Sequence, residues 1–323
     1  MTARLVAKEP AVKVDELTIR YGGFTAVDAV SFSASPGEVT VILGPNGAGK
    51  TSTVEHLEGY RRSTSGHSAV LGHDPIRDRR ELSTRVGIML QEGGIPMSIR
   101  PRDVLRQYAG FFDDPLDPDE VLERVGLTRH ASTTFRRLSG GEKQRLSLGL
   151  ALIGRPEVAF LDEPTASVDL AGRDSIAAII GDLRSEGVCV IVTTHDLGEA
   201  EKLADHVVIL DRGRVVADGT LDELLADNSG DDVYFAASGS LDSRRLGEHL
   251  GRHVIVVGSG EFSVAGQGDK TRTMADVSMW CSNNHVELLD MRSGRLRLDD
   301  LFRRLTAGGP SSSEPASERG GPE

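Results

Sequence analysis

The stretch that most constrains this chain is GPNGAGKTS, residues 44–52, which matches the pattern G-x-x-x-x-G-K-[ST]. It follows the apolar run of residues 39–43 and opens a segment that reads as a helix. The glycines allow the backbone to curl until several N–H groups face one anion, and the helix that follows adds the positive end of its dipole. The sequence therefore predicts a strand–loop–helix unit that binds the phosphates of a nucleotide.

Two side chains of this loop carry further chemistry. Lys50 can reach terminal phosphates, and the hydroxyl of Thr51 can ligate a magnesium ion. The alternative is a glycine-rich turn with a lysine at its rim, a pattern that arises by chance in roughly 1% of chains of this length. We therefore expect a bound nucleotide with Mg²⁺. The residues assigned to the nucleotide site are Gly44, Pro45, Asn46, Gly47, Ala48, Gly49, Lys50, Thr51 and Ser52.

Charge and composition narrow the class of protein. A formal net charge of −12 disfavours general nucleic-acid binding, which needs a basic surface. The two cysteines, Cys189 and Cys281, suit a reducing compartment without a disulfide framework. The first ten residues lack the apolar core of a signal peptide, and no apolar run is long enough to cross a bilayer. Any membrane span would therefore come from another chain.

The order of expected elements indicates an α/β fold. Apolar strands alternate with helices from residue 39 to residue 217, which is typical of a mostly parallel sheet with helices on both faces. Alternating strands at 12–20 and 26–33 predict an antiparallel portion, and residues 92–155 are expected to include a helical lobe. After a polar stretch, the chain reads strand–helix–strand–strand–helix–strand, the ferredoxin-like order.

These patterns predict four segments. Residues 1–11 form a loose leader, residues 12–228 the nucleotide-binding domain, and residues 229–306 a small α+β domain. The last segment, residues 307–323, is rich in Ser, Pro, Gly and Glu and is expected to be disordered.

A second phosphate-binding helix start is predicted at LSGGEKQR, residues 138–145. Ser139 and Glu142 have the spacing of a capping box, which is the simple structural explanation. Gly140 and Gly141 weaken the helix that they begin, so their presence indicates a close approach of the backbone to another group. The first turn of a helix attracts anions.

A pair of acids ends the buried strand VAFLDE, residues 158–163. At that position Asp162 can hold magnesium beside Thr51, and Glu163 can accept a hydrogen bond from an attacking water. Two acids at a strand end are common by chance, but behind a phosphate loop we prefer the catalytic interpretation.

The order of these motifs resembles the ATP-binding-cassette (ABC) ATPase family over residues 12–225. The resemblance implies that Tyr21 stacks on adenine, that Gln91 contacts magnesium and senses a membrane partner, and that Asp169 lies in a loop crossing a dimer interface. It also implies that His195 contacts the terminal phosphate, so that Glu163, His195, Lys50 and Gln91 are the catalytic set. The alternatives are a core-capping aromatic for Tyr21, a strand-end polar residue for Gln91 and an ordinary loop histidine for His195.

The resemblance further implies a dimer in which residues 139–142 of one subunit close over ATP held by the other, the second subunit being an identical chain or a close paralogue. Two positions depart from the common pattern, Glu142 in place of Gln and Val168 in place of Leu. Neither removes a group that the chemistry requires, so we expect an active ATPase.

The GYRR segment, residues 59–62, and the LDDLFRRLT ending, residues 298–306, resemble the bacterial drug- and antibiotic-exporter branch. That branch implies a separately encoded transmembrane permease, a location at the cytoplasmic face of the membrane, and export of drugs, antibiotics or lipid-like substrates. The alternative function is a soluble ATPase of the same family acting on ribosomes or DNA. A single cassette and an acidic composition disfavour it.

Overall fold

The computed structural model describes residues 9–89, 94–166, 168–227, 232–238, 241–258, 260–264, 269–293 and 298–306. The chain divides into two compact units, residues 1–224 and 225–323, which are described separately. The domain boundary predicted near residue 228 lies outside the described residues, as do most of the predicted leader and the whole of the predicted tail.

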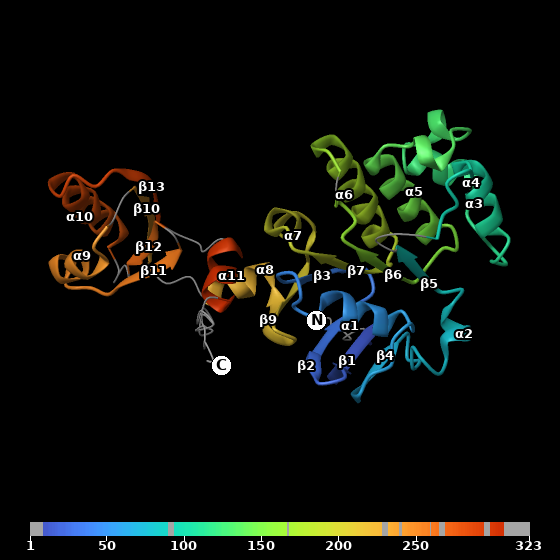
Figure 1. The fold of residues 1–323 in the computed structure, drawn as a ribbon, viewed down its shortest axis with the longest axis horizontal. Coiled ribbons are helices and arrows are strands. Elements are labelled where there is room, and N and C mark those ends of the chain that lie inside the picture. Colours follow the sequence, from blue (N-terminus) through green and yellow to red (C-terminus); the bar gives the residue numbers. More distant parts are fainter. Residues whose placement is uncertain are drawn as a thin grey trace, which may run out of the picture. The chain divides into compact units, whose positions relative to one another are not determined.

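A six-stranded sheet is the centre of the first unit (Figure 1). Its neighbouring strands run parallel except for the last pair, which is antiparallel. Every residue of the three central strands β6, β7 and β3 is buried, as expected for a parallel sheet covered on both faces. In spatial order the strands are β5 (Val86–Met89), β6 (Val158–Asp162), β7 (Cys189–Thr194), β3 (Val39–Leu43), β8 (His206–Asp211) and β9 (Arg214–Thr220).

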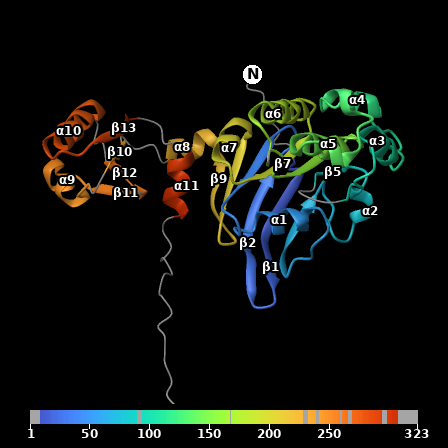
Figure 2. The ribbon, with the colours of Figure 1, turned by 45° about the horizontal axis from the view of Figure 1, so that its top comes forward.

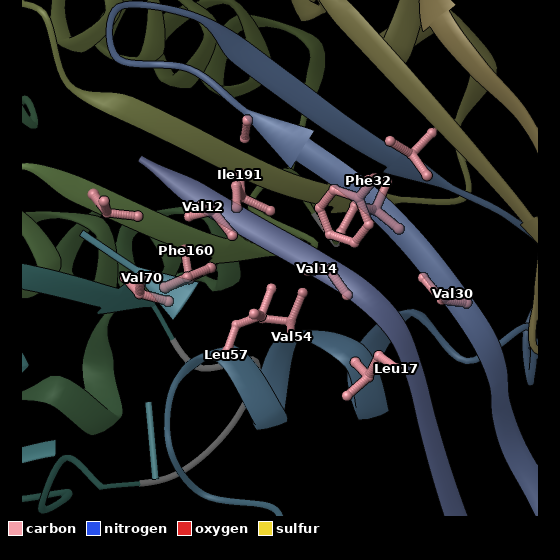
Figure 3. Close-up of a cluster of buried hydrophobic side chains, with 14 of the residues drawn as sticks. Val12, Val14, Leu17, Val30, Phe32, Val54, Leu57, Val70, Phe160 and Ile191 are labelled. Carbon is pink, nitrogen blue, oxygen red and sulfur yellow. The ribbon is translucent and has the colours of Figure 1, made fainter. Parts of the chain in front are cut away.

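An antiparallel sheet and helix α1 (Lys50–Leu57) cover one face of the central sheet. The antiparallel strands are β2 (Phe24–Ala34), β1 (Val12–Tyr21) and β4 (Ser65–Val70). Figure 3 shows Val54 and Leu57 of α1 pointing toward apolar side chains of these strands and of the central sheet, including Val12 and Phe160. This core holds the helix that begins at the phosphate loop.

Helices α5 (Gly140–Leu152), α6 (Leu170–Ser185) and α7 (Leu197–Leu203) cover the opposite face, as Figures 1 and 2 show. Helix α6 begins before residue 174, where the sequence predicted it, because Asp169 caps it by accepting a hydrogen bond from the Gly172 amide at 3.0 Å. The other helical segments described in this unit are α2 (Arg79–Leu82), α3 (Pro101–Ala109), α4 (Pro118–Arg124) and two 3₁₀ turns (Thr128–His130 and Phe135–Arg137). Helix α8 (Leu221–Asp227), which was not predicted, begins in this unit and continues past its last residue, 224.

The second unit has the predicted ferredoxin-like order. Its elements are β10 (Val233–Ala237), α9 (Ser243–Leu250), β11 (Val254–Gly258), β12 (Glu261–Val264), α10 (Lys270–Asn283), β13 (Leu288–Ser293) and α11 (Leu298–Thr306). The strands pair antiparallel in the order β11-β12-β10-β13. Phe235, Phe262 and Trp280 are part of its own apolar core. Over the described portion of the whole chain, no helix combines the length and apolarity needed to cross a membrane.

Candidate nucleotide-binding and hydrolysis site

The phosphate loop joins the buried end of β3 to the first residue of α1. Gly47 and Gly49 have φ angles of +82° and +102°, which side chains of L-residues rarely permit. A Cβ atom on Gly49 would lie 2.6 Å from the Ala26 carbonyl oxygen, and one on Gly44 would overlap the Leu210 carbonyl. Gly44 is therefore required by the close approach of β8, a reason that the motif alone does not reveal.

An open pocket of about 460 Å³ lies over this loop. Its floor is residues 46–52, and its walls are Tyr21, Phe24, Ala26 and Glu163. The structure thus brings together the loop, the predicted adenine-stacking tyrosine and the second acid of the VAFLDE strand. Phe24 and Ala26 were not predicted as site residues, because they belong to a strand with no motif of its own.

Lys50 is almost fully buried, with 6% of its surface exposed. Its Nζ donates hydrogen bonds to the carbonyl oxygens of Gly44 at 2.8 Å and of Pro45 at 3.2 Å. Burial lowers the pKa of the Lys50 ammonium, while the charges of Glu163 and Asp162 act in the opposite direction. The ammonium is therefore held inside the loop by neutral acceptors, which an anionic ligand can replace with a stronger charge-assisted bond.

Asp162 and Glu163 share a partner that the sequence did not predict, Thr193 at the end of β7. The hydroxyl of Thr193 donates to Asp162 Oδ1 and accepts a hydrogen bond from the Glu163 amide at 3.1 Å. Burial raises the pKa of Asp162, and the Thr193 hydrogen bond opposes that rise. A nearby cation would offset the cost of ionising this acid in its buried position.

Glu163 adopts a left-handed backbone conformation with φ of +46°, which is strained for a residue other than glycine. Its amide also donates to the Thr193 carbonyl at 3.1 Å, and its own carbonyl accepts from Gln144 Nε2 at 3.0 Å. Its carboxylate lies 3.0 Å from Nδ1 of His195. The predicted pair Glu163 and His195 is thus in direct contact; Glu163 lines the pocket, and His195 lies behind it, outside the described lining.

The LSGGE segment begins α5 as predicted. Ser139 Oγ accepts from the Glu142 amide at 3.3 Å, and Glu142 Oε2 accepts from the Ser139 amide at 2.7 Å, so the capping box is formed. His130 Nε2 lies 3.1 Å from Glu142 Oε1. Residues 139–142 are absent from the described lining of the phosphate-loop pocket, so one chain does not bring its two predicted phosphate-binding helix starts together.

The predicted roles of three further site residues, Tyr21, Asp169 and Gln91, remain predictions. The Tyr21 hydroxyl lies 3.1 Å from Ser52 Oγ, and the guanidinium of Arg61 covers its ring at 4.7 Å from the centroid. The stacking role of Tyr21 remains a prediction. Asp169 is the N-cap of α6, and its interface role remains a prediction too. Gln91 lies outside the described residues.

A glycine-rich loop between the buried parallel strand β3 and a helix, with two acids at the end of β6, which is separated from β3 by β7 alone, defines a phosphate-loop nucleoside triphosphatase. The profile of the ABC transporter family matches residues 27–166. The chain is 34% identical over 305 residues to a daunorubicin resistance ATP-binding protein of Streptomyces coeruleorubidus, covering 92% of this chain and 96% of that protein. It is 29% identical to a linearmycin resistance ATP-binding protein of Bacillus subtilis, covering 91% and 98%.

Solved structures agree on the fold. The ATP-binding subunit of an ABC transporter superposes with a TM-score of 0.62 at 24% identity, over 67% of this chain and 92% of that one. A dimeric bacterial ABC transporter cassette gives 0.60 at 23% identity, over 65% and 98%. The chain belongs to the ABC transporter family and is an ATP-binding, ATP-hydrolysing subunit of it.

Proposed function

We propose that this subunit powers the export of antibiotic-like or lipid-like compounds. The mechanism rests on one observation: Glu163, which lines the phosphate-loop pocket, is in contact with His195. The substrate class is supported by the near full-length similarity to proteins named for daunorubicin and linearmycin resistance.

The roles within one chain follow from position and charge. Lys50 and the loop amides bind the phosphates of ATP, and Glu163 orients the attacking water. His195, whose Nδ1 contacts the Glu163 carboxylate, would bind the terminal phosphate through its other ring nitrogen. For Mg²⁺, the oxygen donors Thr51 and Asp162 suit a hard cation, which neutralises phosphate charge when bound. The raised pKa of Asp162 also fits a site completed by a cation.

The working unit is a pair of cassettes. Support comes from the separation of residues 139–142 from the pocket of their own chain, and from the dimeric state of a cassette with the same fold. In such a pair, the first turn of α5 supplies amides and the Ser139 hydroxyl to a nucleotide held by the partner. ATP then acts as a switch that closes the pair, and hydrolysis reopens it.

The second partner is a membrane permease encoded as a separate chain, with the ATPase bound at the cytoplasmic face. The support is membership of the ABC transporter family, together with relatives of nearly equal length that are named as ATP-binding proteins.

The Glu163→Gln variant tests both the site and the partner. It should bind ATP as tightly as the wild type, lose about 10²-fold or more in turnover, and accumulate as an ATP-bound dimer in size-exclusion chromatography. Lys50→Ala, the contrasting variant, should lose nucleotide retention. Wild-type turnover by Glu163→Gln would remove Glu163 from the mechanism.

The same trapped variant, tagged and solubilised from its native membranes with ATP, should bring down a polypeptide with several membrane spans. Recovery with ribosomes or DNA instead would favour the soluble alternative.

A further inference from the structure

One side chain of α5 reaches the backbone of the catalytic acid. Gln144 is half-buried, one turn from the start of the helix, and its Nε2 donates to the Glu163 carbonyl oxygen at 3.0 Å. The contact joins two segments that are 19 residues apart in the sequence and that belong to different motifs. None of the roles proposed above for phosphate binding or hydrolysis involves Gln144.

This hydrogen bond holds the backbone of Glu163, whose conformation sets the position of the carboxylate. The residue has a φ of +46°, a conformation that costs about 1–3 kcal/mol unless its surroundings impose it. Thr193 holds the amide of Glu163, and the carbonyl accepts from Gln144 Nε2 and from the Ala166 amide, each at 3.0 Å. Loss of Gln144 leaves the Ala166 amide as the remaining donor to this carbonyl, so that the peptide can rotate toward a relaxed conformation, and the carboxylate would turn away from His195 with it.

Gln144 follows the first turn of α5, which is the predicted phosphate-binding turn. Gly141 and Gln144 are three residues apart and therefore lie on one face of the helix. A Cβ atom on Gly141 would lie 3.3 Å from Val168 Cγ1, so the same turn also packs closely against the loop before α6. The capping box between Ser139 and Glu142 fixes the backbone of this first turn, and Gln144 follows directly in the same helix.

We propose that Gln144 is a positioning residue for Glu163 of its own chain, and that it ties the phosphate-binding end of α5 to the catalytic carboxylate. The proposal rests on the role proposed above for Glu163. It assigns Gln144 to hydrolysis at the phosphate loop of the same chain, although the end of α5 itself faces the nucleotide of the partner.

The first experiment measures steady-state ATPase kinetics of the full-length chain. Gln144→Leu keeps the side-chain volume and removes the donor, and should lower kcat about tenfold, since small misplacements of a catalytic group are costly, with KM within about twofold. Gln144→Lys, which keeps a donor, should recover part of the loss. Ser147→Ala, on the same helix, is the matched control and should match the wild type. If the Gln144→Leu protein melts at the same temperature as the wild type and its kcat is unchanged, the proposal is overturned.

Mixed dimers then decide in which chain Gln144 acts. In the first, one chain carries Gln144→Leu and the other Glu163→Gln, so the surviving site has its own Gln144 replaced. In the second, one chain carries both substitutions, so the surviving site has its own Gln144 intact and faces an altered α5 from the partner. The reference dimer has Glu163→Gln in one chain only.

The first dimer should be about tenfold slower than the reference, and the second should equal it. The reverse order would show that Gln144 acts through the phosphate-binding turn, and equal rates would show that its effect does not depend on the chain that carries it; either result would overturn the proposal. If ATP fails to produce dimers at all, the proposed pairing is wrong, while the kinetics of the single-chain variants still test Gln144.

Discussion

Glu58 shows at the scale of a single residue how burial changes chemistry. It ends α1, only 8% of its surface is exposed, and among the described residues no hydrogen-bond partner reaches its Oε1. Burial, with smaller contributions from Asp162 and Glu55, raises the pKa of Glu58 from 4.5 to about 8. The folded protein therefore keeps this acid protonated at neutral pH.

The raised pKa predicts a pH-dependent stability. Between about pH 4.5 and 8 the folded chain holds a proton on Glu58 that the unfolded chain has released, so stability falls as pH rises, by up to about 1.4 kcal/mol per pH unit. Glu58→Gln removes this dependence. Its free energy of unfolding relative to the wild type should rise from pH 5 to pH 8 and level off above. Urea unfolding at four pH values measures the difference.

Glu120→Gln, at an exposed position of α4, is the control and should show no such divergence. A constant difference between Glu58→Gln and the wild type across the same pH range would contradict the buried, protonated acid.

At the scale of elements, the distance between β5 and α5 depends on one glycine. Gly87 is buried in β5, and a Cβ atom there would overlap the carbonyl oxygen of Ala151 in α5 and lie 3.0 Å from Pro156 Cγ. Gly181 in α6 is the opposite case, since a Cβ atom there meets nothing within 4 Å. Gly87 is therefore required by close packing, whereas Gly181 only lowers the helix propensity of α6.

Alanine at these positions should change stability in opposite directions. Gly87→Ala forces β5 and α5 apart and should lower the free energy of unfolding by about 1–3 kcal/mol. Gly181→Ala should raise it by about 0.5–1 kcal/mol, because alanine loses less backbone entropy in a helix. Denaturant midpoints at constant m-value measure both changes. If Gly87→Ala is more stable than the wild type, β5 and α5 are not packed closely enough to exclude a Cβ atom at residue 87.

At the scale of the whole molecule, the two units have separate apolar cores. The only tryptophan of the chain, Trp280, belongs to the core of the second unit and is 7% exposed. Its fluorescence therefore reports on that unit, whereas nucleotide binding stabilises the first.

This separation predicts two unfolding transitions that respond differently to ligand. A non-hydrolysable ATP analogue with Mg²⁺ at 100 times its Kd should stabilise the first unit by about 2.7 kcal/mol, seen as a shifted far-UV circular dichroism transition. The Trp280 fluorescence transition should stay in place. An equal shift of both signals would show that the units unfold together.

Local patterns were enough to predict the phosphate loop, the capped start of α5, the acids after β6 and the ferredoxin-like strand order. Each is encoded by residues within a few positions of one another, where backbone geometry and hydrophobic periodicity act directly. Helix α8 was not predicted, although Leu221, Leu224 and Leu225 have helical spacing, because its seven residues are shorter than the window over which helical periodicity is distinct. The start of α6 was predicted too late because Leu170 at its start is exposed and only the cap, Asp169, marks it.

The sequence by itself therefore determined the family and most of the order of elements, and it predicted the groups that bind the phosphates. Only the tertiary structure decided that Thr193 anchors Asp162 and Glu163, that Gln144 holds the Glu163 carbonyl, and that Glu58 is buried as an acid. These partners come from segments separated along the chain, and the order of strands in the sheet and the packing of helices on it bring them within hydrogen-bond distance. No local pattern specifies a neighbour of that kind.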